Sequence, residues 1–237
     1  MSFSNKHIFF DLDRTLWDFD ENSKEALKQI IAHYKLIPVF GSFDRFYRAY
    51  EKHNSRLWGE YGKGNLQKDI LRFERFNATL KQFGKDDVSL AKKMGEMYVE
   101  ISPRQTRQFP NAKEVLEELK KMGYHLHIIT NGFEEVQYIK LENCGLREYF
   151  DVIVCSEAVG KNKPALAIFN YALEQANCIA ENAMMIGDDY IADVSGGLKA
   201  GLQAILFDPH LRSTEKYEFT IQNLNELPLL ATKLLRI

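Results

Sequence analysis

The chain has 237 residues, enough for one large hydrophobic core or for a core with a smaller appended domain. Hydrophobic residues make up 45% of it and charged residues 27%, with a formal net charge of −2, which is typical of a globular protein. Lysine and arginine are spread along the chain, so we expect neither a nucleic-acid polymer nor a membrane as a partner.

The compartment is indicated by the apolar stretches and by the cysteines. The first apolar stretch, residues 8–10, is interrupted by Asp11 and Asp13 and is too short for a signal peptide, and no later stretch approaches a membrane span. The three cysteines are Cys144, Cys155 and Cys178. Their odd number and their spacing, without a metal-binding pair, favour free thiols in a reducing compartment. We expect a cytoplasmic protein.

In the first part of the chain, the pattern of apolar residues changes once, from that of a strand to that of helices. Residues 7–10 (His-Ile-Phe-Phe) predict a short buried strand that ends at Asp11. From about residue 20 to residue 101, apolar residues recur at helical spacing, and no run resembles a strand. This segment predicts an all-helical domain inserted directly after the first strand.

From Pro110 onward, predicted helices and short apolar strands alternate. The helices are expected at 111–122, 134–143, 165–176 and about 191–200, and the strands at 126–129, 152–155, 183–186 and 203–207. Uniformly apolar strands that alternate with helices predict a parallel sheet with both faces covered. We therefore predict the α/β class: a Rossmann-like three-layer core with a mainly parallel sheet (1–16 and 102–237) and a helical domain at 17–101.

Polar side chains follow four of the predicted strands. Asp11 and Asp13 follow the first strand, Thr130 the second, Lys163 lies in the loop after the third, and Asp188 follows the fourth. Ligands of such sheets bind beyond the carboxyl ends of the strands, so we expect these side chains to converge.

The expected cluster of acids requires a cation. Asp11, Asp13, Asp188 and Asp193 repel one another unless a cation neutralises them, and a hard divalent cation with oxygen ligands fits. Mg²⁺ is the predicted cofactor, since it accepts one or two carboxylates together with water and substrate phosphate.

The remaining polar groups suit a phosphoryl group. The Thr130 hydroxyl and the loop amides of Asn131 and Gly132 can bind phosphate oxygens, and Lys163 can pair with both the phosphate and a nucleophilic carboxylate. A carboxylate that attacks a phosphate dianion is repelled by it, so these positive and donor groups are needed. The set is typical of phosphoryl transfer through an aspartyl-phosphate.

Four motifs of the chain resemble, in order, those of the haloacid dehalogenase-like (HAD) hydrolase superfamily. They are Asp11-x-Asp13-x-Thr15, Thr130, Lys163-Pro164 and Gly187-Asp188-x-x-x-x-Asp193, and the resemblance covers the whole chain. It implies that Asp11 is the nucleophile and that Asp13 protonates the leaving oxygen and then activates water. The segment at 17–101 resembles this superfamily's helical cap.

The same resemblance assigns the other site residues. It implies that the Asp11 carboxylate, the Asp13 backbone carbonyl and Asp188 bind Mg²⁺, and that Thr130 and Lys163 hold the transferring phosphoryl group. Asp193 would orient Lys163 or a metal-bound water. For Asp189, a supporting role beside Asp188 and simple solvation are equally open.

Within the superfamily, the chain resembles the pyrimidine 5′-nucleotidases that hydrolyse noncanonical nucleoside monophosphates. Residues 15–19, 57–64 and 72–76 carry this resemblance. Arg14 departs from the pattern, since relatives usually have a small or acidic residue between the two acids. We expect a small phosphorylated substrate and a monomer or weak homodimer.

Two other functions remain open. A sugar-phosphate phosphatase or phosphomutase of the same superfamily would use the same catalytic residues. A receiver-like module, phosphorylated on aspartate as a signal, would also need Mg²⁺, acids, a threonine and a lysine. The inserted segment of about 80 residues and the position of Asp13 disfavour a receiver-like module. A haloacid dehalogenase is disfavoured because its chemistry needs neither Asp13 nor the metal-binding acids.

Overall fold

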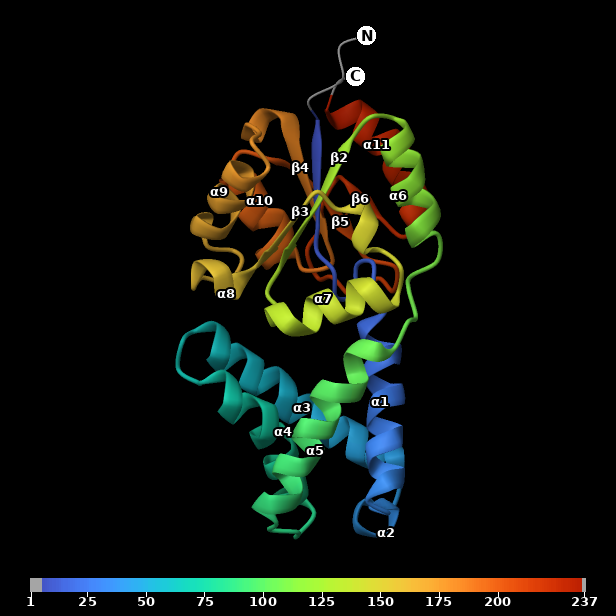
Figure 1. Ribbon diagram of the computed structural model, residues 1–237, viewed down its shortest axis with the longest axis vertical. Helices are drawn as coiled ribbons and strands as arrows, with labels where there is room; N and C mark the ends of the chain where they lie inside the picture. The colour runs from blue at the N-terminus through green and yellow to red at the C-terminus, as the bar shows by residue number, and fades with distance from the viewer. Residues whose placement is uncertain (1–5, 236–237) are drawn as a thin grey trace. The chain divides into compact units, whose positions relative to one another are not determined.

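The computed structural model describes residues 6–235, and the chain divides into two compact units (Figure 1). One unit consists of the chain up to Phe19 together with the chain from Thr106 onward, and the other is Asp20–Gln105. Sequence reasoning placed the boundaries after residues 16 and 101. The first boundary falls later because Trp17 belongs to the α/β unit, where its backbone forms β-bridges with Asp13 and Gln108, and the second lies after Gln105.

The α/β unit contains one sheet of six parallel strands in the order β3-β2-β1-β4-β5-β6. The strands are β1 (His7–Phe10), β2 (His125–Thr130), β3 (Val152–Cys155), β4 (Ala183–Gly187), β5 (Gln203–Phe207) and β6 (Thr220–Ile221). This order is that of a Rossmann-like sheet, in which the direction of winding reverses between β1 and β4. The predicted fold class is confirmed.

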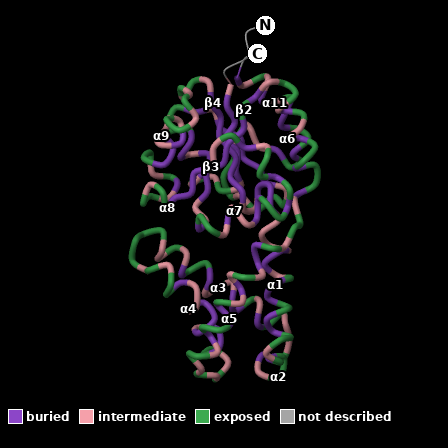
Figure 2. Tube along the Cα trace, in the orientation of Figure 1, coloured by how far each residue is buried: buried purple, intermediate pink, exposed green. Residues whose placement is uncertain are grey.

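Alternate side chains of each strand pack against opposite layers of helices. On one face, Ile8 and Phe10 of β1 belong to a core formed with α6 (Ala112–Lys121) and α11 (Leu227–Leu234). On the other face, Phe9 belongs to a core formed with α9 (Leu166–Gln175). Figure 1 shows α9 and α6 on either side of the sheet, and Figure 2 shows the strands as the most continuously buried part of the unit. Both faces are covered, which explains why the strands are mostly apolar.

The remaining helices of this unit are short or follow the strand ends. They are α7 (Glu134–Asn143), α8 (Ser156–Val159), α10 (Gly196–Lys199), a π-helix (Tyr190–Ser195) and the 3₁₀ turns Arg147–Tyr149, Ala180–Asn182 and Leu224–Glu226. The single helix expected at about 191–200 is therefore wrong: a π-helix precedes α10. Sequence reasoning also did not predict β6 and α11.

The second unit is helical throughout and has its own core. It contains α1 (Phe19–His33, whose first residue lies in the α/β unit), α2 (Ile37–Phe40), α3 (Phe43–Gly62), α4 (Lys68–Gln82), α5 (Val88–Ile101) and the 3₁₀ turn Ser102–Arg104. Phe46 and Tyr50, four positions apart on one face of α3, are fully buried there together with Phe76 of α4. Helices α4 and α5 approach closely at Gly95, where any Cβ atom would lie 2.7 Å from the Arg72 carbonyl oxygen.

Histidines cluster near the amino ends of β1 and β2. The Nδ1 atom of His7 lies 2.9 Å from Nε2 of His127, and the His7 ring stacks on His125. Asp151 lies 2.9 Å from both His125 and Lys120. Burial, reinforced by neighbouring histidines, lowers the pKa of His7 to about 4 and that of His127 to about 3. This buried pair is therefore neutral at pH 7 and structural.

No helix within residues 6–235 has the combination of length and apolarity that a membrane crossing requires.

Candidate active site

The candidate nucleophile Asp11 lies directly after β1, at the point where the strand order reverses. Its backbone amide donates to the Ile186 carbonyl at 2.8 Å, so the chain is still paired with β4 at this residue. The side chain is buried, and its Oδ2 atom accepts a hydrogen bond from the Thr15 hydroxyl at 3.3 Å. The edge of the sheet thus fixes both the backbone and the carboxylate of Asp11.

Lys163 joins two buried carboxylates at this edge. Its Nζ atom lies 2.7 Å from Asp11 Oδ1 and 2.6 Å from Asp193 Oδ1, and it donates to the Ile129 carbonyl at 2.8 Å. Only 2% of the Lys163 side chain is exposed. Although burial opposes the charge, Asp11 and Asp193 raise the pKa of Lys163 above its ordinary value. The lysine is therefore a permanent cation between the two acids.

The Lys163 backbone is held by Asn131, the residue that follows β2. The Asn131 carboxamide accepts from the Lys163 amide at 2.8 Å and donates to the Lys163 carbonyl at 3.2 Å. This pair of bonds ties the loop after β3 to the end of β2. The binding of phosphate by the Asn131 loop amide stays a prediction, and the side chain has the additional contact with the lysine backbone.

Asp193 is fixed by a close approach to the backbone at the end of β4. Its Oδ2 atom accepts from the Asp189 amide at 3.1 Å, while Oδ1 contacts Lys163. A Cβ atom at Gly187 would lie 2.1 Å from Asp193 Oδ2, so glycine is required there. The carboxylate of Asp189 points back to its own helix, where it accepts from the amides of Ile191 and Ala192 at 2.8 Å each. Asp189 is therefore an N-cap.

Three acids form a cluster that suits a metal ion. Oxygen atoms of Asp11, Asp188 and Asp193 lie within 4.8 Å of one another. Burial raises the pKa of Asp11 to about 7, with Lys163 opposing the shift and Asp193 adding to it. Burial and the charges of Asp11 and Asp193 also raise the pKa of Asp188 well above its ordinary value. The cluster thus holds more negative charge than Lys163 compensates.

The donor set decides which acids could bind the ion. Both oxygens of Asp193 are already engaged, one with Lys163 and one with the Asp189 amide. Asp188 is left for a cation, together with Asp11 Oδ2, whose hydrogen bond from the Thr15 hydroxyl is long at 3.3 Å. Carboxylate oxygens are hard ligands, and one or two of them suit Mg²⁺, which keeps several waters.

The predicted phosphate-binding residues lie at the end of β2. Thr130 is the last residue of that strand and is buried. Its hydroxyl accepts a hydrogen bond from the Gly132 amide at 3.1 Å, which leaves the hydroxyl proton for another acceptor.

Asp13 has partners that sequence reasoning missed. Lys140 of α7 places its Nζ atom 2.5 Å from Oδ1 and 2.8 Å from Oδ2 of Asp13, and Gln137 donates to Oδ2 at 3.1 Å. Gln137 and Lys140 are three positions apart and buried, so they share one face of α7. Two polar residues at helical spacing next to a predicted phosphate-binding loop are the only signal that the sequence offers.

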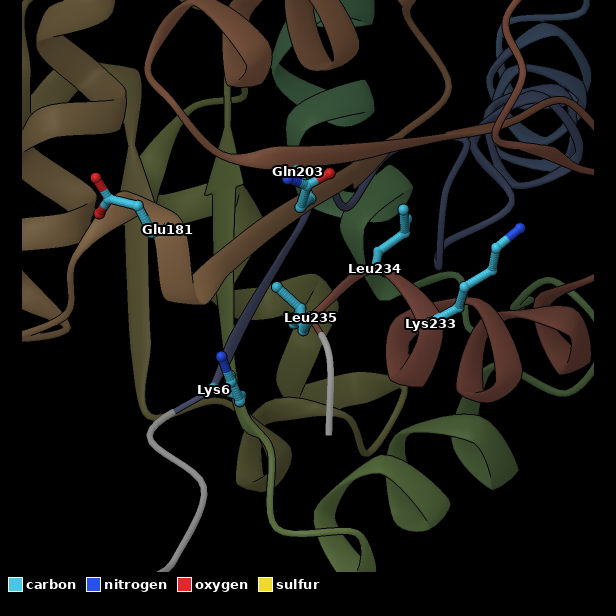
Figure 3. A pocket seen from close by; sticks show the side chains of 6 residues that line it. All are labelled: Lys6, Glu181, Gln203, Lys233, Leu234 and Leu235. Atoms are coloured by element: carbon cyan, nitrogen blue, oxygen red, sulfur yellow. The ribbon is translucent and has the colours of Figure 1, made fainter.

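A pocket of about 410 Å³ lies at the opposite, amino end of the strands (Figure 3). It is lined by Lys6, Glu181, Gln203, Lys233, Leu234 and Leu235. None of these residues belongs to the predicted site.

Comparisons with known proteins show the family of the chain. The family model of haloacid dehalogenase-like hydrolases matches residues 8–207. Pyrimidine 5′-nucleotidase YjjG of Escherichia coli (strain K12) is 34% identical over 233 residues, 95% of this chain and 97% of that protein. Ribulose-1,5-bisphosphate 5-phosphatase of Halopiger xanaduensis is 33% identical over 205 residues, 85% of this chain and 84% of that protein. The solved structure of the HAD-hydrolase YfnB from Bacillus subtilis, bound to magnesium, has a TM-score of 0.85 and 27% identity, and covers 98% of this chain and 99% of that one. The chain belongs to the haloacid dehalogenase-like hydrolases.

Proposed function

We propose that this protein is a Mg²⁺-dependent phosphate monoester hydrolase that acts on pyrimidine nucleoside 5′-monophosphates through a phosphorylated Asp11. The observation that carries the proposal is the buried contact of Lys163 with Asp11 and Asp193, beside the acid of Asp188. Lys163 opposes the effect of burial on Asp11 and so favours the ionised carboxylate that a nucleophile requires.

In the first step, an oxygen of Asp11 attacks the phosphorus atom, and the bond between phosphorus and the ester oxygen breaks. Asp13 gives its proton to the leaving oxygen, so that an alcohol departs. Lys163 and the Thr130 hydroxyl stabilise the negative charge on the transferring group. The product of this step is an acyl phosphate on Asp11.

In the second step, water attacks the same phosphorus atom. Asp13, now ionised, takes a proton from the water, and the bond between phosphorus and the Asp11 oxygen breaks. Inorganic phosphate leaves, and both aspartates return to their starting states. The two steps therefore use Asp13 once as an acid and once as a base.

Asp11, the Asp13 carbonyl and Asp188 would hold the Mg²⁺ ion. When bound, Mg²⁺ neutralises the acids and stabilises negative charge on the phosphate oxygens. The unbalanced negative charge of the acid cluster and its hard oxygen donors support this assignment.

Two substrate classes have support. The similarity to YjjG, over nearly the full length of both chains, favours a pyrimidine nucleoside monophosphate. The similarity to a ribulose-1,5-bisphosphate 5-phosphatase, at nearly the same identity, makes a sugar phosphate the second candidate. Both would be hydrolysed by the same residues.

The three cysteines support a reducing, cytoplasmic location. All are free thiols, and burial raises the pKa of each, so none has an activated thiolate.

The test is phosphate release with Mg²⁺ from 5′-UMP, 5′-dUMP, 5′-dTMP, purine monophosphates, ribulose-1,5-bisphosphate and other sugar phosphates. We expect preferential release from the pyrimidine monophosphates, loss of activity in EDTA, and no turnover by the Asp11→Asn variant. Preferential release from sugar phosphates would keep the mechanism and replace the substrate. Near-normal turnover by Asp11→Asn, or a stable phosphoprotein without turnover in the native chain, would overturn the hydrolase mechanism.

A further inference from the structure

Lys140 is a buried cation whose position the proposed reaction does not by itself explain. Its side chain is 4% exposed, and the Asp13 side chain that it contacts is 22% exposed. Moving an ammonium group out of water costs several kcal/mol, and apolar residues often stabilise such a site as well or better. A buried lysine in this place therefore indicates a role beyond stability.

Two side chains of α7 fix the orientation of the Asp13 carboxylate. The Lys140 Nζ atom reaches both oxygens, at 2.5 and 2.8 Å, so the carboxylate cannot rotate without breaking a contact. Gln137 donates to Oδ2 from the same helix at 3.1 Å. Asp13 and Lys140 are 127 positions apart, and α7 brings the cation to the acid.

Neighbouring residues accommodate the side chains of both Lys140 and Gln137. The Lys140 ammonium lies 4.2 Å from the centre of the Trp17 ring, a cation–π contact that offsets part of the lost hydration. A Cβ atom at Gly132 would lie 1.6 Å from Gln137 Nε2, so the glycine leaves room for the amide. The loop after β2 and α7 therefore act together on Asp13.

We propose that Lys140, assisted by Gln137, is the positioning residue of Asp13. Its ammonium group fixes the carboxylate at the place from which Asp13 exchanges protons with the leaving oxygen and with water. This inference rests on the proposed hydrolase function. Lys140 acts through Asp13 and not on the phosphate, because its ammonium is enclosed by Asp13 and Trp17, whereas Lys163 contacts Asp11.

The consequence is a loss of rate without a loss of substrate binding. Lys140→Met keeps an unbranched side chain beside Trp17 and removes the charge that holds Asp13. Misplacement of a catalytic group by about 1 Å costs on the order of 100-fold. We expect kcat to fall by about 10- to 100-fold and KM to change by less than about threefold. Lys140→Arg, which keeps the charge and the donors, should recover part of the rate.

The decisive experiment is a double-mutant cycle with p-nitrophenyl phosphate, comparing the native protein, Lys140→Met, Asp13→Asn and the double variant. If Lys140 acts through Asp13, its replacement should change the residual activity of Asp13→Asn by less than about twofold. An equal loss in both backgrounds, or native kcat in Lys140→Met, would overturn the proposal. Should Lys140→Met fail to fold, Lys140→Gln and Lys140→Arg complete the same cycle.

Two controls separate this inference from others. Lys120→Met removes a lysine that contacts the exposed Asp151 at 2.9 Å near the amino ends of the strands, and it should leave kcat unchanged. Asp11→Asn tests the hydrolase function itself. Activity that depends on Asp11 but not on Lys140 refutes only the positioning role, whereas activity that persists in Asp11→Asn refutes the function on which it rests.

Discussion

Removing the buried charge of Lys163 should cost the protein both stability and activity. In Lys163→Met, Asp11 and Asp193 lose the cation that lies 2.7 and 2.6 Å away, and both carboxylates stay buried. The effect on activity follows from the proposed reaction, since the same ammonium holds the nucleophile and stabilises the transferring group. The effect on stability follows from electrostatics alone.

The magnitude can be estimated from the distances. At an effective dielectric constant of about 20, two opposite unit charges 2.7 Å apart attract by about 6 kcal/mol. The cost of burying the charges offsets much of this attraction, but removing one partner of a buried pair leaves that cost uncompensated, at about 3–5 kcal/mol. We therefore expect the free energy of unfolding to fall by about 3–5 kcal/mol without divalent cations.

The assay is urea denaturation in EDTA at neutral pH, followed by circular dichroism, with phosphate release measured in parallel. The matched control is Lys161→Met, because Lys161 lies in the same loop and is exposed. We expect the control to change stability by less than about 0.5 kcal/mol. A loss of less than about 1 kcal/mol in Lys163→Met would refute the reasoning, since it would mean that the contact behaves as an exposed ion pair.

Three further predictions concern other parts of the chain. Asp189→Ala removes the N-cap of the π-helix and should lower the free energy of unfolding by about 1 kcal/mol in urea denaturation; an unchanged midpoint would contradict the capping role. Gly95→Ala forces a methyl group against the Arg72 carbonyl and should destabilise the helical unit by about 1–3 kcal/mol in thermal unfolding; a gain in stability, as helix propensity alone predicts, would contradict the close approach. In the folded protein the pKa values of His7 (about 4) and His127 (about 3) lie below the value of about 6.5 for a histidine in the unfolded chain. At a pH between the folded and unfolded values, the unfolded state therefore binds more protons, and stability falls as the pH drops from about 6.5 toward 4. Urea denaturation at pH 7 and pH 4.5 should show a smaller loss in His127→Gln than in the native protein, and equal losses would show that the pair does not carry the effect.

Much of this molecule follows from local patterns. Parallel strands that are buried on both faces are mostly apolar, so the strands ending at Phe10, Thr130, Cys155, Gly187 and Phe207 could be recognised within one residue. Once the sheet is parallel, the carboxyl ends of its strands share one edge, so Asp11 and Asp188, which directly follow strands, lie at that edge. Helical spacing likewise predicts the inserted helical unit, whose buried aromatic residues recur along one helix face.

Other features were decided by tertiary contacts. The two-residue strand β6 exists because the edge of β5 offers it hydrogen-bonding partners, and no local pattern in Thr220–Ile221 signals this. The helix expected at 191–200 begins as a π-helix, and the Asp189 carboxylate caps its first amides.

The supporting contacts of the site also depended on the fold. Chain order and the strand pattern placed Asp11 and Asp188 just after strands, and the resemblance to the superfamily's motifs selected Lys163 and Asp193. Only the tertiary structure decided that Asn131 holds the Lys163 backbone and that Lys140 holds Asp13. The physical reason is that a hydrogen bond depends on the direction of each side chain and on distances of a few tenths of an ångström between distant segments. Packing sets both, and residue order alone does not.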